Sequence, residues 1–131
     1  MRNYYVWLVF LTLLLIGCSR SSAPTQSQLD SSINGGTFTA SPNEKFSLRL
    51  DLDADGGYQW KYEISDSTIV TMDAQPTVQA PKNVVGGVSV ETFYFRVVKE
   101  GECTMTFNQS RAWEQGVAPI STVKFFVVTN P

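Results

Sequence analysis

The stretch Phe46-Ser-Leu-Arg-Leu-Asp-Leu52 alternates large apolar residues with small or charged ones. A period of two places the apolar side chains on one face of a β-strand and the polar ones on the other. The acidic, glycine-rich segment Asp53-Ala-Asp-Gly-Gly57 follows, and Tyr58-Gln-Trp-Lys-Tyr-Glu-Ile64 then repeats the alternation. Two such strands, each apolar on one face, indicate a sheet structure that covers a core.

The same alternation recurs along the rest of the chain. It is clear at residues 93–97, 103–107 and 123–127, and weaker strands are expected near residues 37–40, 68–72 and 78–81. No segment shows a convincing helical period. Strands at this spacing, separated by Gly, Asp and Pro turns, predict an all-β fold, an immunoglobulin-like β-sandwich of about 7–8 strands.

The N-terminal segment has the layout of a signal peptide. Arg2 precedes the apolar run 4–16, which is too short for a comfortable transmembrane helix and is followed by Gly17-Cys18. This pattern resembles the bacterial lipobox, in which cleavage leaves the cysteine, here Cys18, as a lipid-carrying N-terminus. An ordinary membrane anchor is the alternative, and both interpretations place the remaining chain outside the cytoplasm. Ser19 after the cysteine favours the outer membrane.

The sequence therefore divides into three parts. Residues 1–17 form the predicted lipoprotein signal peptide. Residues 18–35 are polar and small, so they are expected to be a flexible tether that cannot bury enough surface to fold alone. Residues 36–131 are about one small domain in length, and we expect that domain to be monomeric.

Composition excludes several kinds of function. The 131 residues contain no histidine, which removes His-based triads, imidazole acid–base catalysis and most zinc sites. Once Cys18 carries lipid, Cys103 is alone, and its place in an alternating strand predicts a small buried apolar group. The net charge of −2 is scattered without a basic stripe, so nucleic acid is not an expected partner. An enzyme is disfavoured, and no cofactor is expected.

The acidic segment has a second interpretation. Asp51-x-Asp53-x-Asp55-Gly56 matches the start of an EF-hand calcium loop. Its twelfth position is Tyr62, where a bidentate glutamate is required, and its flanks are predicted strands instead of helices. We therefore expect an acidic hairpin-like turn and no metal, with calcium binding as the alternative.

Three predicted loops carry unusual residues: 53–57, 83–89 and the loop that contains residues 111–114. In an immunoglobulin-like sandwich, loops that join alternate strand pairs gather at one end. Glycines at 56, 57, 86 and 87 permit close approach of another backbone.

Tryptophan has different expected roles at two positions. Trp60 falls on the apolar face of its strand and is expected in the core. Trp113 lies in a loop, where an indole either packs back over the sandwich or contacts a partner. We expect Trp113 to be a contact residue, while Arg111 either joins it or pairs with Glu114 at the rim.

Together these motifs resemble the chagasin family, immunoglobulin-like inhibitors of papain-type cysteine proteases, over about residues 46–128. That family typically has loops reading Asn-Pro-Thr-Thr-Gly-Tyr, Gly-x-Gly-Gly and Arg-Pro-Trp. The matching positions are Gly57-Tyr58 with Trp60, Gly86-Gly87, and Arg111 with Trp113.

The resemblance implies a reversible inhibitor that occludes the protease cleft with three loops and performs no chemistry. Loop residues 53–57 would fill the catalytic centre, with the other two loops on either side of it. The implied protease-binding residues are Asp53, Ala54, Asp55, Gly56, Gly57, Tyr58, Gly86, Gly87, Arg111, Ala112 and Trp113.

Gly86-Gly87 lies two residues farther from the strand at Phe93 than is usual in the family. The other two loops depart from the family pattern in their residues. Residues 53–56 replace Asn-Pro-Thr-Thr and bring two carboxylates that must lose water on binding. Ala112 stands where the family has proline, which makes its loop less preorganised. Both changes are expected to weaken inhibition. A non-inhibitory surface interaction module is therefore the alternative function.

Overall fold

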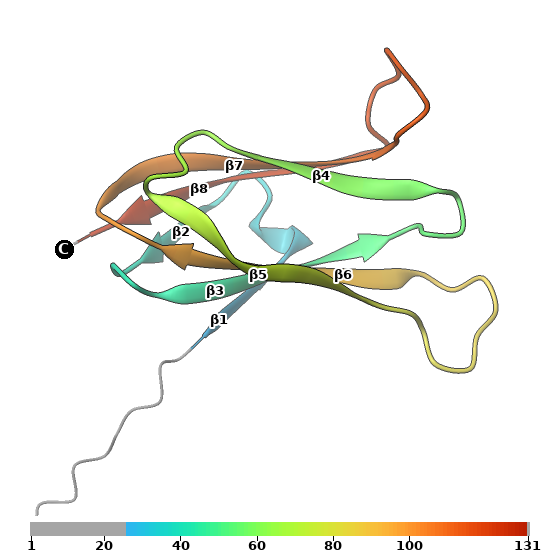
Figure 1. Cartoon of the computed structure of the whole chain (residues 1–131), viewed down its shortest axis with the longest axis horizontal. Helices are drawn as coiled ribbons and strands as arrows, with labels where there is room; N and C mark the ends of the chain where they lie inside the picture. The colour runs from blue at the N-terminus through green and yellow to red at the C-terminus, as the bar shows by residue number, and fades with distance from the viewer. Residues whose placement is uncertain (1–25, 131) are drawn as a thin grey trace, which may run out of the picture.

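The computed structural model describes residues 26–130, which fold into two four-stranded sheets packed face to face (Figure 1). The first sheet has the order β1 (Ser27–Asp30), β3 (Lys45–Leu52), β6 (Ser89–Val97) and β5 (Val70–Gln79). The second has the order β2 (Thr37–Ala40), β8 (Ser121–Thr129), β7 (Gly101–Arg111) and β4 (Tyr58–Ile64). The predicted all-β sandwich is confirmed.

The connection between β3 and β4 differs from the expectation. β3 pairs with β6, whereas β4 pairs with β7 in the opposite sheet. The prediction of a hairpin-like turn at residues 53–57 is therefore wrong, because this segment crosses from one sheet to the other. The crossing lets the apolar faces of both strands meet across the core, where the Trp60 indole N–H donates to the Asp51 carbonyl at 2.9 Å.

The core lies between the sheets and is rich in aromatic side chains. Five phenylalanines are fully buried: Phe46, Phe93, Phe95, Phe107 and Phe125. Trp60 belongs to the same cluster, as predicted. Cys103 is also buried there, and burial, with a smaller contribution from the Asp66 charge, raises the pKa of its thiol. Its predicted core role is confirmed.

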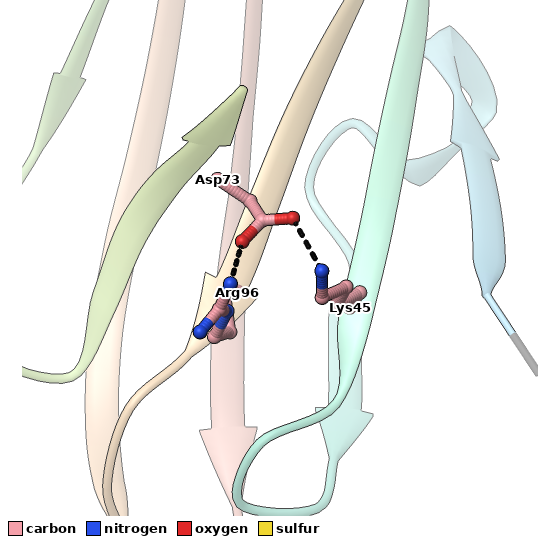
Figure 2. A network of polar contacts seen from close by, with 3 residues as sticks. All are labelled: Lys45, Asp73 and Arg96. Atoms are coloured by element: carbon pink, nitrogen blue, oxygen red, sulfur yellow. Dashed lines mark hydrogen bonds and ion pairs between the residues drawn. The ribbon is translucent and has the colours of Figure 1, made fainter. Parts of the chain in front are cut away.

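Strand β5 joins two segments that were expected to be separate weak strands. Its pairing with β6 shifts register between Met72 and Ala74 and again between Ala74 and Thr77. Asp73, at the first shift, forms ion pairs with Lys45 of β3 and Arg96 of β6 (Figure 2). The hydrogen bonds from Lys45 and Arg96 hold the pKa of the Asp73 carboxyl below its ordinary value. This cluster fastens the irregular edge strand to the sheet.

The predicted flexible tether is wrong for residues 27–35. Strand β1 pairs in parallel with β3, and a 3₁₀ helix, Ser31–Ile33, follows it. Leu29 and Ile33 pack against the core. Few apolar side chains suffice here because the segment completes an existing core and does not have to form one alone.

The predicted signal peptide and lipidation site lie outside the described residues. Within residues 26–130, no helix is long and apolar enough to cross a membrane.

The chain termini and the three long connecting loops lie at opposite ends of the sandwich. Ser27 is paired with Phe46 at the start of β3, and Thr129 is paired with Gly101 at the start of β7. Both termini of the described chain therefore lie at one end. The connections β3–β4, β5–β6 and β7–β8 project from the other (Figure 1).

Candidate functional site: three loops at one end of the sandwich

The candidate site consists of three neighbouring loops. Loop 1 is residues 53–57, loop 2 is residues 80–88 and loop 3 is residues 112–120. The structure places the predicted site residues within or directly beside these loops. Tyr58 is the first residue of β4, and Arg111 is the last of β7. The residues predicted from the sequence to form the site therefore lie together at one end of the molecule (Figure 1).

Loop 1 is closed by its own hydrogen bonds. The Asp53 carboxylate accepts from the Gly56 N–H at 3.1 Å, and the Gly57 N–H donates to the Ala54 carbonyl at 3.0 Å. Tyr58 N–H donates to the Asp53 carbonyl at 3.2 Å. One carboxylate of the EF-hand-like pattern is thus used to fix the loop. Residues 26–130 contain no group of three or more His, Cys, Asp or Glu side chains arranged to hold a metal.

Arg111 connects loop 1 to loop 3. Its Nε donates to the Gly56 carbonyl at 2.7 Å, and its guanidinium carbon lies 4.4 Å from the centre of the Tyr58 ring. Its Nη1 also pairs with Glu114 at 3.1 Å. The rim pairing with Glu114 is therefore one part of a larger brace. The two residues of this hydrogen bond are 55 positions apart in the sequence, so no local sequence pattern predicts it.

Trp113 combines exposure with a fixed seat. It is 68% exposed, so it is not packed over the end of the sandwich as a core residue would be. One edge of its indole nevertheless lies on Gly57, where an added Cβ would approach the Trp113 Cη2 to 2.3 Å. The ring is therefore supported by loop 1 while most of its surface faces solvent. This is the arrangement of an anchor residue in a binding surface.

Loop 2 contributes apolar side chains that sequence reasoning missed. The loop motif singles out Gly86 and Gly87, whereas the exposed large apolar side chains of this loop are Val84, Val85 and Val88. Loop 3 adds exposed Val117 and Ile120. The signal was available, because three valines in a glycine-rich loop exceed what a solvated turn needs. Exposed apolar groups gathered at one end of a small domain indicate a protein-binding surface.

The loops also approach one another across the tip. A Cβ at Gly86 would lie 4.0 Å from an Asp55 carboxylate oxygen, so loop 2 lies beside the apex of loop 1. Together the three loops form one surface with an acidic centre at Asp53 and Asp55 and apolar sides.

An immunoglobulin-like sandwich with an anchored indole and three loops at one end defines a loop-presenting binding protein. Residues 39–127 match the family model described as chagasin family peptidase inhibitor I42. The chain belongs to this family of peptidase inhibitors, which is not a family of enzymes. The resemblance drawn from the loop motifs is confirmed.

Known relatives agree with this assignment. The chain is 28% identical over 95 residues to Amoebiasin-2 of Entamoeba histolytica, a match that covers 70% of this chain and 76% of that protein. The fold is similar to that of the cysteine protease inhibitor EhICP2 from Entamoeba histolytica, with a TM-score of 0.71 at 24% identity. That alignment covers 79% of this chain and 95% of the other.

A second solved structure, of PbICP-C in complex with falcipain-2, has a TM-score of 0.54 at 17% identity. It covers 82% of this chain and 93% of the other. These structures share the sandwich architecture described above.

Proposed function

We propose that this chagasin-family inhibitor binds papain-family cysteine proteases reversibly and occludes the active-site cleft with its three loops. The observation that carries the proposal is the braced surface formed by loops 1 and 3, with Trp113 seated on Gly57 and largely exposed. Two relatives support the class of partner. One is named a cysteine protease inhibitor, and the other was solved in complex with falcipain-2.

Inhibition would be a matter of shape without covalent chemistry. Loop 1 enters the cleft, while loops 2 and 3 contact the enzyme on either side of it. A rigid loop loses little conformational freedom on binding, so more of the contact energy appears as affinity. Ala112 lacks the rigidity that a proline would give loop 3. The hydrogen bond from Arg111 to the Gly56 carbonyl instead restrains the neighbouring loop 1.

The proposal is tested by titrating papain and a panel of related bacterial enzymes with the purified protein. We expect reversible loss of protease activity, relieved by excess substrate. Trp113→Ala should weaken inhibition by about 30-fold or more, because exposed aromatic anchors dominate such interfaces. Phe126→Ala is the matched control, since Phe126 is 45% exposed on β8 outside the loops.

Two outcomes would contradict the proposal. One is the absence of any rate loss at large molar excess across the panel. The other is recovery of a non-protease partner whose binding survives Trp113→Ala. The second result would favour the non-inhibitory interaction module, for which the carboxylates of Asp53 and Asp55 in loop 1 are the motivating observation.

We propose further that the mature protein is a bacterial lipoprotein anchored through Cys18, at the outer membrane. The support is the apolar run that ends in Gly17-Cys18, with Ser19 next. Metabolic labelling with a fatty-acid analogue should mark the wild type and leave Cys18→Ala unlabelled. Separation of inner and outer membranes then tests the location. Equal labelling of both proteins would contradict lipid attachment at this residue.

A further inference from the structure

A groove lies beneath loops 1 and 3, on the side where β4 and β5 are the sheet edges. Its volume is about 580 Å³, within the range of protein ligand sites. Its walls are mostly apolar and aromatic. The residues that matter are Leu52, Tyr58, Trp60, Val78, Glu91 and Trp113.

Glu91 is the one charged side chain in the lining of this groove. It lies on β6 in the same alternation as buried Phe93 and Phe95, so its side chain is directed toward the space between the sheets. Its strand neighbours are Leu50 on one side and Val78 on the other. A carboxylate has therefore taken the position of a core residue where the sandwich opens.

This carboxylate has no partner within the described chain. No hydrogen bond or ion pair to it is formed by residues 26–130. Burial raises the pKa of Glu91, and no neighbouring charge offsets that rise. Arg111, the cation that joins loops 1 and 3, is already engaged by the Gly56 carbonyl and Glu114. The carboxylate is therefore partly desolvated, and no contact compensates for that cost in free energy.

We infer that this groove, which we call the Glu91 groove, receives a lysine or arginine side chain that projects from the rim of the target protease. The inference rests on the proposed function and adds the chemistry of the partner. The aliphatic stem would lie along the apolar wall formed by Leu52, Val78 and the aromatic rings. The cationic head would pair with Glu91 and gain further attraction from the faces of Trp60 and Trp113.

Other occupants fit the groove less well. A neutral apolar side chain would bury Glu91 further and leave it unpaired, which is costly. An acidic group would add like-charge repulsion. A calcium ion requires six to eight oxygen ligands, whereas this lining offers a single carboxylate. A long cationic side chain satisfies both the charge and the apolar walls.

A small probe tests the groove without any protease. The purified protein is titrated with n-butylguanidinium chloride and, separately, with uncharged N-butylurea, while the indole N–H signals of Trp60 and Trp113 are followed by NMR. We expect saturable shifts with the cation in the millimolar range, as befits so small a ligand. Glu91→Gln should weaken this binding by about ten-fold. Glu102→Gln, an exposed carboxylate at the opposite end of β7, should not change it.

Binding of N-butylurea as strong as that of n-butylguanidinium would overturn the inference. Unchanged binding of the cation by Glu91→Gln would do the same. Thermal unfolding of Glu91→Gln and Glu102→Gln shows whether each variant is folded. We expect both to fold, because Gln has nearly the shape of Glu.

The second arm measures inhibition by the wild type, Glu91→Gln, Glu91→Lys and the control Glu102→Gln. We expect Glu91→Gln to raise the inhibition constant by about ten-fold, and Glu91→Lys to raise it further because like charges then meet. Full inhibition by Glu91→Gln would overturn the groove's role while leaving the proposed function intact. If the wild type inhibits no enzyme, the proposed function fails and the probe titration alone decides the groove.

Discussion

At the residue scale, Gly57 determines where the anchor Trp113 can lie. Its φ of +76° is in the left-handed region, and a Cβ there would meet the indole at 2.3 Å. The position therefore requires glycine both for backbone conformation and for contact between loops 1 and 3. At Gly35 and Gly116 only the requirement for a positive φ applies, because nothing lies within 4 Å of an added Cβ.

Gly57→Ala should displace Trp113 and weaken inhibition by about ten-fold or more, in addition to backbone strain of about 1 kcal/mol. Gly35→Ala is the matched control, because Gly35 has the same φ of +76° with nothing within 4 Å of an added Cβ. Both variants should lose similar stability in urea unfolding, but only Gly57→Ala should change Trp113 fluorescence and inhibition. Equal inhibition by the two variants would contradict the role given to the Trp113 seat.

Glu91 also makes a prediction about stability. Because burial raises its pKa in the folded state, the folded protein binds more protons than the unfolded chain between the two pKa values. The contribution of this group to stability therefore falls as pH rises through that window. Glu91→Gln should be more stable than the wild type near neutral pH, and the difference should vanish in acid. Urea unfolding at several pH values measures this, with Glu102→Gln as control, and a less stable Glu91→Gln at neutral pH would contradict it.

At the scale of elements, the binding surface depends on contacts between loops that belong to different strands. β3 and β4 lie in opposite sheets, so loop 1 is held at both ends by different layers of the sandwich. Arg111 at the end of β7 then fixes the middle of loop 1 through the Gly56 carbonyl. The loop is thus positioned by three separate elements before any partner arrives.

Arg111→Met keeps much of the side-chain stem and removes the guanidinium. We expect loop 1 to loosen, with faster hydrogen exchange of the Gly57 amide, which bonds to Ala54, and about ten-fold weaker inhibition. Glu114→Gln is the control, since it removes only the ion pair at the rim and should have little effect. Weaker inhibition with unchanged exchange would show instead that Arg111 acts by direct contact with the enzyme.

Sequence reasoning succeeded where the signal is local and failed where it is not. The alternation around Phe46–Leu52 reports burial of one face, so the strands and the core position of Trp60 could be predicted. The bond from Arg111 to Gly56 and the Asp73 cluster join distant segments, and no spacing rule encodes them. Val84 and Val85 were overlooked because the neighbouring glycines matched a motif and the valines did not.

At the scale of the whole molecule, the N-terminal segment seals both sheets. β1 adds to β3 of the first sheet, and β2 adds to β8 of the second, each in parallel. The 3₁₀ helix Ser31–Ile33 lies between them, and Gly35 N–H donates to the Lys124 carbonyl at 2.7 Å. The expected start of the domain at Gly36 would omit the first of these two edge strands.

A chain beginning at Gly36 should therefore be less stable than one beginning at Gln26. Loss of Leu29 and Ile33 from the core and of the β1–β3 pairing should cost about 2–5 kcal/mol. The exposed edge of β3 should also promote aggregation. Urea unfolding and light scattering compare the two proteins directly. Equal midpoints would show that β1 contributes nothing to the fold.

The termini of the described chain and the three loops lie at opposite ends of the sandwich. A surface or a label can therefore be attached without covering the loops. Ser27 enters and Thr129 leaves at the end remote from loops 1, 2 and 3 (Figure 1). A bead, a fluorescent reporter or a lipid joined at either terminus is thereby directed away from the binding surface. Immobilised copies would all present their loops outward. A dense layer of such copies would recapture a released enzyme and so slow its loss from the surface, because the local concentration of free loops is high.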